Sequence, residues 1–163
     1  MLSRWECRSA PLPGPIEPMW LSCSQSTFPD RSTTIAQREG IAAALESEEL
    51  AAAVSGGVNQ TIELAVVEWA EEQRLLVPWT VLRGRDDLEA LATHLRRAGR
   101  SWVHTMTDPG GGIAAAERLF ADQPFAALRR VIDVSGDGRQ NTGEVATADA
   151  RDAAVSHGLT VNG

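Results

Sequence analysis

The residues best placed for chemistry follow a short apolar run near the end of the chain. The run VIDV at 131–134 leads into SGDG at 135–138, a pattern typical of a buried strand that ends in a sharp turn. In open α/β sheets, ligands bind at the carboxyl ends of parallel strands. The pattern therefore predicts an oxygen-rich site around Asp137. The residues 141–143 lie next to Asp137 and can shape this loop. Taken alone, SGDG is also ordinary turn chemistry.

Composition bounds the class of protein. The chain has 163 residues, 43% of them hydrophobic and 23% charged, which is typical of a single soluble globular domain. A net charge of −7 argues against nucleic acid or an anionic membrane as partner. No apolar run is long enough to span a bilayer, and the N-terminus has no apolar signal-peptide core, so the localisation stays unknown, with the cytoplasm as the default. Two cysteines make no disulfide framework and no zinc cluster.

The strands and helices that would position such a site can be predicted from the hydropathy pattern. A helix is expected from Thr34, with a restart near Ser47 because three glutamates are unfavourable at a helix C-terminus. Further helices are expected at 86–98, 113–120 and 146–157, and strands at 61–70, 75–82, 131–134 and 159–162. Pro78 predicts an edge strand, and the apolar 61–70 run predicts burial on both faces. Strands alternating with helices predict an α/β fold, a Rossmann-like, mostly parallel central sheet with helices on both faces.

Several blocks of the sequence resemble a bacterial family of uncharacterised von Willebrand factor A-like (vWA) proteins. The resemblance runs from about Thr34 to Gly163, and RRVIDVSGDGRQNTG is its most specific block. The other blocks are QREGIAAAL at 37–45, AVVEWA at 65–70, LVPWTVL at 76–82, GIAAAERLF at 112–120 and GLTVNG at 158–163. The resemblance implies a metal-ion-dependent adhesion site, in which three loops at one end of the sheet hold a divalent cation, usually Mg²⁺. A protein partner then offers a carboxylate to the open coordination position.

Four residues of this sequence match the metal-ligand positions of the family pattern. Asp137 matches the third loop, and Thr107 matches the second, with Thr105 as the alternative. Ser24 and Ser26, from SCSQS at 22–26, match the first loop, but a serine stands where the family has its aspartate. Loss of that carboxylate predicts a weaker, partial site, because charge is removed from the ligand shell. Mn²⁺ and Ca²⁺ are the alternative ions.

The N-terminal segment differs from the rest of the chain. It holds five of the eight prolines and both cysteines, although the run from Met19 to Cys23 resembles a short strand. Either SCSQS is a degenerate first loop, or the residues before about Thr33 are not family sequence. The second interpretation predicts an irregular segment at 1–32 and a vWA-like domain at 33–163. Because the sequence stops straight after its last predicted strand, we expect a domain truncated at both ends.

The same loop also fits a different cation motif. Residues 133–144 place oxygen-bearing side chains at positions one, three, five, nine and twelve of an EF-hand calcium loop, with Gly138 at position six. Against this, Gln140 occupies a position that is usually aliphatic, no second loop is visible, and the flank resembles a strand where an EF-hand needs a helix.

The function expected from these patterns is a protein-binding module with a partial or vestigial Mg²⁺ site and no catalysis. No nucleophile–base pair or phosphate-binding glycine loop is evident. Two alternatives stay open: a metal-dependent hydrolase, in which an ion at Asp137 activates water, and a truncated product with little function of its own.

Overall fold

The computed structural model describes residues 19–24, 31–98, 106–123, 126–136 and 138–163. Within these ranges, helices and strands alternate along most of the chain, so the mixed α/β class predicted from the sequence is confirmed. The elements are β1 (Met19–Ser24), α1 (Arg31–Leu45), α2 (Glu48–Gly56), β2 (Ile62–Trp69), β3 (Gln73–Leu82), α3 (Arg85–Arg97), α4 (Pro109–Ala121), β4 (Arg130–Ser135), α5 (Thr147–Ser156) and β5 (Thr160–Asn162).

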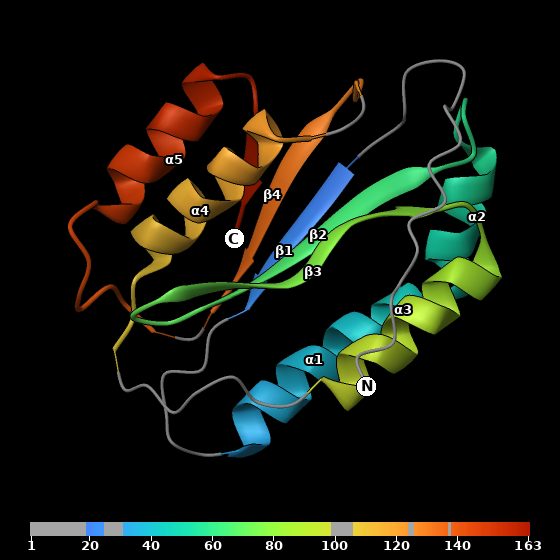
Figure 1. Ribbon diagram of the computed structural model, residues 1–163, viewed down its shortest axis with the longest axis horizontal. Helices are drawn as coiled ribbons and strands as arrows, with labels where there is room; N and C mark the ends of the chain where they lie inside the picture. Colours follow the sequence, from blue (N-terminus) through green and yellow to red (C-terminus); the bar gives the residue numbers. More distant parts are fainter. Residues whose placement is uncertain (1–18, 25–30, 99–105, 124–125, 137) are drawn as a thin grey trace.

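The described strands form one sheet in the order β3-β2-β1-β4-β5. β1 pairs in parallel with β2 and with β4, β4 pairs in parallel with β5, and only the β2–β3 hairpin is antiparallel. Figure 1 shows three layers, with α4 and α5 on one side of the sheet and α1, α2 and α3 on the other. Parallel pairing brings the carboxyl ends of β1, β2 and β4 to one edge of the sheet.

The central position of β1 corrects the expected domain boundary. A boundary at 32/33 leaves Met19–Ser24 outside the domain, whereas this strand pairs on both sides at the centre of the sheet. Composition misled here because a six-residue strand needs little periodic pattern when a neighbour on each side completes its backbone hydrogen bonds.

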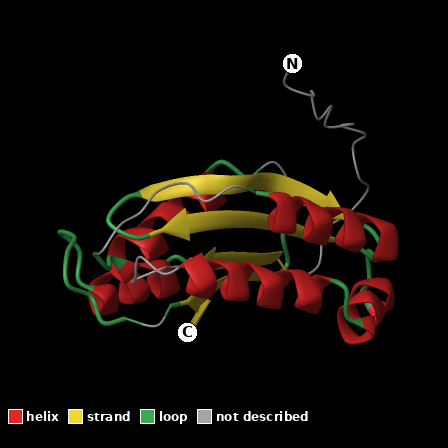
Figure 2. Cartoon of the chain, turned by 90° about the horizontal axis from the view of Figure 1, so that it is seen from below, coloured by secondary structure: helices red, strands yellow, loops and turns green. Residues whose placement is uncertain are grey.

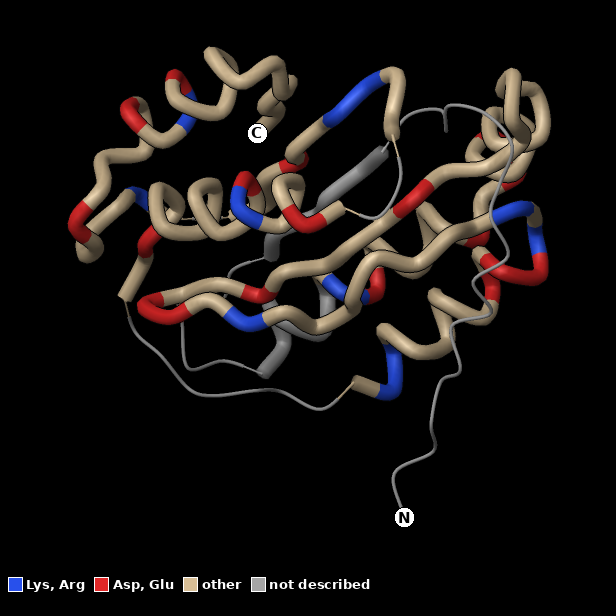
Figure 3. Tube along the Cα trace, turned by 45° about the horizontal axis from the view of Figure 1, so that its top comes forward, with Lys and Arg blue, Asp and Glu red and all other residues tan. Residues whose placement is uncertain are grey.

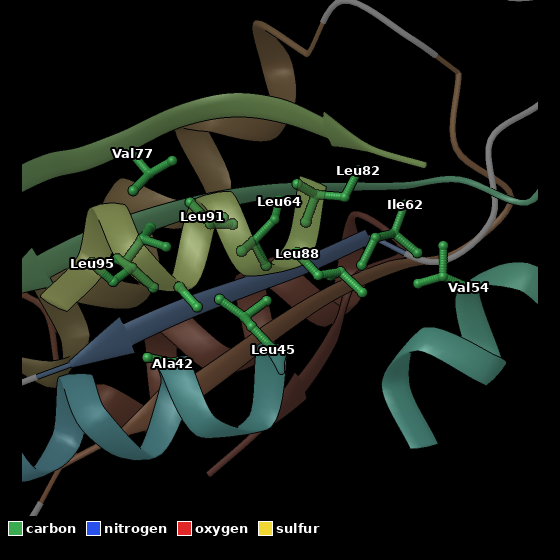
Figure 4. Close-up of a cluster of buried hydrophobic side chains, with 12 residues drawn as sticks. Ala42, Leu45, Val54, Ile62, Leu64, Val77, Leu82, Leu88, Leu91 and Leu95 are labelled. Atoms are coloured by element: carbon green, nitrogen blue, oxygen red, sulfur yellow. The ribbon is translucent and has the colours of Figure 1, made fainter. Parts of the chain in front are cut away.

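The core on the side of α1, α2 and α3 is aliphatic. Leucines from α1 and α3 meet the even-numbered side chains of β2, and Figure 4 shows them pointing toward one another. The buried cluster consists of Ala42, Leu45, Val54, Ile62, Leu64, Val66, Val77, Leu82, Leu88, Leu91, Ala92 and Leu95. Every residue of β2 is buried, as its continuous apolar run predicted.

The core on the side of α4 and α5 contains aromatic rings. Trp69, Phe120 and Ile132 are buried in it, and Trp79 packs on Phe120 with ring centroids 5.3 Å apart. The Trp79 Nε1 also donates to the Leu119 carbonyl at 3.0 Å, which ties β3 to α4. Figure 2 shows the connecting loops gathered at the two ends of these layers. A site at the sheet edge is therefore carried by a packed scaffold.

Local signals set several boundaries as predicted. The first helical stretch breaks and restarts at Ser47, whose hydroxyl accepts from the Leu50 amide at 3.2 Å as the N-cap of α2. β3, which contains Pro78, is an edge strand. Among the described helices, none combines the length and the apolar character needed to cross a bilayer.

Candidate cation and partner site

The candidate site lies where the parallel strands end. Ser24, the last residue of β1, is in register with Glu68 of β2 and with Ser135 of β4. In Figure 1, the β2–β3 turn, the start of α4 and the chain that precedes α5 come together at this end of the sheet. Three segments that are distant in the sequence are thus neighbours at one edge.

Two of the four predicted ligands can be located. Ser24 ends β1, and Thr107 lies just before α4 with its side chain fully buried. Ser26 and Asp137, as well as the alternative Thr105, lie outside the described residues. The described backbone does bring the second loop against the segment that follows Asp137.

That contact is made by Thr107 and Asn141. The Thr107 amide donates to Asn141 Oδ1 at 2.6 Å, and the Thr107 carbonyl accepts from the amides of Asn141 at 3.0 Å and Thr142 at 3.3 Å. Thirty-four residues separate the two partners in sequence. The backbone of the second loop is therefore held on both sides by the third.

Asp108 is a site residue that sequence reasoning missed. Its amide donates to the Ala70 carbonyl at the end of β2 (2.9 Å), and its Oδ1 accepts from the Gly111 amide at 2.8 Å as the N-cap of α4. Its Oδ2 accepts from Gln73 Nε2 at 3.4 Å. The carboxylate therefore orients the loop, and both of its oxygens have protein donors. Aspartate directly before a proline at the first helical position is the signal that could have identified this cap.

Glycines let these segments approach closely. A Cβ on Gly110 would lie 2.1 Å from the Val145 carbonyl oxygen, and one on Gly112 would lie 2.9 Å from the Trp69 ring. Gly143 has a φ of +92°, and a Cβ there would lie 2.1 Å from Asp108 Oδ1. Gly110 and Gly143 are therefore required where the two loops meet, and Gly112 is required where α4 packs on Trp69.

The far side of the third loop is fastened by Gln140. Its Nε2 donates to the carbonyls of Thr142 (3.0 Å) and Val145 (2.7 Å), and its Oε1 accepts from the amide and hydroxyl of Thr147, both at 2.8 Å. Gln140 thus supplies the helix-capping acceptor at the start of α5, where the N-cap Ala146 has none.

This arrangement overturns the EF-hand interpretation. Asp133, its first calcium position, is inside β4, in register with Ser22 and Asn162. An EF-hand loop needs a preceding helix, and a strand cannot supply that geometry. Burial raises the pKa of the Asp133 carboxyl. Gln140, the unusual eighth residue of the supposed loop, binds the local backbone instead.

A buried ion pair supports the same edge from the other face of the sheet. Arg38 of α1 donates from Nη2 to Glu68 Oε1 at 2.6 Å, and its Nη1 donates to the Ala98 carbonyl after α3. Both side chains are more than nine-tenths buried. Exposed carboxylates of Glu71 and Glu72 stand at the β2–β3 turn, and Figure 3 shows charges of both signs interspersed elsewhere. The pair fixes α1 and α3 to the end of β2.

The described residues fit part of a divalent-cation shell. The hydroxyl of Thr107 is a ligand of the hard type that Mg²⁺ accepts, but carboxylates supply most of the attraction. In the described part of the chain, no group of three His, Cys, Asp or Glu side chains could hold a metal.

Comparison with known proteins places the chain in a family. The model for "Protein of unknown function (DUF1194)" matches residues 19–163. The chain belongs to this family. The match begins at Met19 and so includes β1, ahead of the boundary expected at 33. No curated protein sequence matches the chain.

Solved structures support a vWA-like fold. An aerotolerance-related membrane protein from Bacteroides fragilis is 21% identical with a TM-score of 0.60, over 90% of this chain and 65% of that chain. Proximal thread matrix protein 1 from the mussel byssus, with a zinc-occupied MIDAS motif, has a TM-score of 0.68 at 13% identity, over 90% and 37%. The pilus adhesin SpaC from Lactobacillus rhamnosus GG has a TM-score of 0.60 at 11% identity, over 90% and 24%. The chain thus spans less than two thirds of these neighbours.

Proposed function

We propose that this domain is a protein-binding module whose partner docks at the carboxyl end of the sheet through a weakly held divalent cation. Ser24, Ser26, Thr107 and Asp137 would hold the ion, with Mg²⁺ the expected species and Mn²⁺ or Ca²⁺ the alternatives. A bound ion would offer an open coordination position to a carboxylate of the partner. No catalytic step is proposed.

The observation that carries this proposal is the contact between Thr107 and Asn141. Its two hydrogen bonds, with a third from the Thr142 amide, join the loop before α4 to the loop after β4, next to the carboxyl ends of parallel strands. Sites in such folds form at that edge. Thr107, chosen from the family pattern, is also fully buried there although a threonine in a loop is ordinarily exposed.

The neighbours add support of a general kind. One of them carries a zinc-occupied MIDAS motif, and another is a pilus adhesin. These are properties of those proteins, and the identities are low, so they favour cation-assisted binding here without specifying the ion or the partner.

The cation is tested by thermal unfolding during titration with MgCl₂, MnCl₂ or CaCl₂. An ion that binds only the folded state raises the midpoint by mass action. We expect a rise in the wild type, no rise in Asp137→Ala, and a reduced rise in Thr107→Val, which keeps the side-chain shape but lacks the hydroxyl. Thr160→Val, on an exposed residue of β5, is the matched control and keeps the full rise. A wild type with no midpoint change for any of the three ions would rule out the cation.

The partner chemistry is tested on an array of peptides that contain Asp or Glu, paired with peptides that contain Asn or Gln at the same positions. We expect binding to the acidic peptides in MgCl₂, loss of that binding in EDTA, and loss in Asp137→Ala. Equal binding to acidic and amide peptides would exclude a partner carboxylate as the ligand.

A further inference from the structure

Asn141 forms hydrogen bonds with both backbone polar groups of Thr107, the amide and the carbonyl. Its side-chain oxygen accepts from the Thr107 amide at 2.6 Å, and its own amide donates to the Thr107 carbonyl at 3.0 Å. The Asn141 side chain is otherwise largely exposed. A single exposed asparagine therefore holds both backbone polar groups of a fully buried threonine.

Both partners are themselves anchored. Asp108, next to Thr107, is tied to the end of β2 and to the first turn of α4. Gln140, next to Asn141, is tied to the backbone of its own loop and to the start of α5. Gly143 lies so close to the Asp108 carboxylate that a side chain at position 143 would not fit.

We propose that Asn141 is a positioning residue that holds Thr107 in its ligand orientation before any cation or partner binds. The part of this inference that concerns the cation rests on the proposed function. A preformed loop spares the ion the entropic cost of ordering a ligand. Residues that orient metal ligands without touching the metal typically change affinity by about 10- to 100-fold when replaced.

The first experiment measures hydrogen exchange of the Thr107 amide in EDTA. We expect Asn141→Ala to speed exchange at least about tenfold, since the amide loses its acceptor. Asn141→Asp retains an acceptor at the same atom and should keep the protection. Asn162→Ala, an exposed asparagine at the end of β5, is the control and should leave it unchanged. Unchanged exchange in Asn141→Ala, or lost protection in Asn141→Asp, would overturn the proposal.

The second experiment measures Mg²⁺ and Mn²⁺ affinity by calorimetry. We expect Asn141→Ala to bind about 10- to 100-fold more weakly than the wild type and than Asn162→Ala. If exchange rises but affinity is unchanged, Asn141 stabilises the loop without positioning a ligand, and the inference is wrong. If the wild type binds neither ion, the proposed cation fails, while the exchange experiment still decides whether Asn141 holds Thr107.

Discussion

Two buried glutamates lie near the two ends of β2, and they differ in the partners of their carboxylates. Glu68, at the carboxyl end, is buried against Arg38 at 2.6 Å. Glu63, near the amino end and on the opposite face of the strand, is fully buried, and Gln123 Nε2 donates to one of its oxygens at 3.0 Å. Within the described residues, Glu63 Oε1 has no hydrogen-bond partner. Among the described residues, the Glu68 carboxylate pairs with a guanidinium, whereas the Glu63 carboxylate accepts only from a side-chain amide.

The comparison extends to the neighbourhood of each glutamate. At the carboxyl end of the sheet, Thr107 and Asp108 have hydrogen-bond partners, although Trp69 Nε1 is buried without one among the described residues. Beside Glu63, the Thr61 hydroxyl is buried without a partner among the described residues. Buried polar groups are normally paired because unpaired ones cost stability. The glutamate at the carboxyl end therefore has a charged partner, whereas the glutamate at the amino end is buried at a cost, and replacement of the two carboxylates should act in opposite directions.

The largest effect is expected from Glu68→Gln. Removal of the carboxylate takes a buried counter-ion from Arg38 and should lower the free energy of unfolding by about 3 kcal/mol. Urea denaturation measures the loss. Glu89→Gln breaks the exposed Arg85–Glu89 pair at 3.7 Å and should change stability by less than about 0.5 kcal/mol. Equal effects of the two substitutions would show that the buried Arg38–Glu68 pair stabilises the fold no more than an exposed pair does.

Gly143→Ala should have the next largest effect. The new Cβ would meet Asp108 Oδ1 at a left-handed backbone position, so we expect a loss of about 2 kcal/mol or more in unfolding free energy. Gly40→Ala is the matched control, because nothing lies within 4 Å of its Cβ in α1, and it should gain about 0.5–1 kcal/mol. Chemical denaturation of both variants checks the contrast; a neutral Gly143→Ala would contradict the close approach.

Glu63→Gln should act in the other direction. Burial raises the pKa of the Glu63 carboxyl, and the hydrogen bond from Gln123 offsets part of this. The folded state therefore holds a proton that the unfolded chain loses above pH about 4.5. Wild-type stability should fall as the pH rises from there through the raised pKa, and Glu63→Gln should lack this fall and be the more stable protein at pH 7.

Denaturation curves from pH 4 to 8 test this contrast. Glu89→Gln serves as a surface control that should keep the wild-type pH dependence. A Glu63→Gln variant with the same pH profile as the wild type would show that the Glu63 carboxyl is not responsible.

The smallest effect is expected from Gln123→Ala. Loss of the donor to Glu63 should raise the pKa of that carboxyl further and cost about 0.5–1 kcal/mol at pH 7. The cost should shrink at pH 4, where the carboxyl is protonated in both proteins. A double-mutant cycle with Glu63→Gln measures the coupling, and a coupling near zero would mean that the two side chains do not interact.

Hydropathy patterns predicted the described elements well where the pattern was continuous. The apolar run of β2, the edge strand with Pro78 and the helix restart at Ser47 all have local causes, and each is confirmed. β1 and the cap at Asp108 were harder. A short central strand depends on its neighbours for hydrogen bonds, and a cap residue resembles any other polar loop residue.

By itself, the sequence determined most of the segments that form strands and helices, and that a carboxylate follows the end of β4 in the chain. Those properties depend on side chains within a few residues of one another. The tertiary structure alone decided that Thr107 contacts Asn141 thirty-four residues away, that Arg38 pairs with Glu68, and that Asp108 accepts a hydrogen bond from Gln73. Such contacts arise only when the sheet brings distant strand ends to one edge, which no local pattern records.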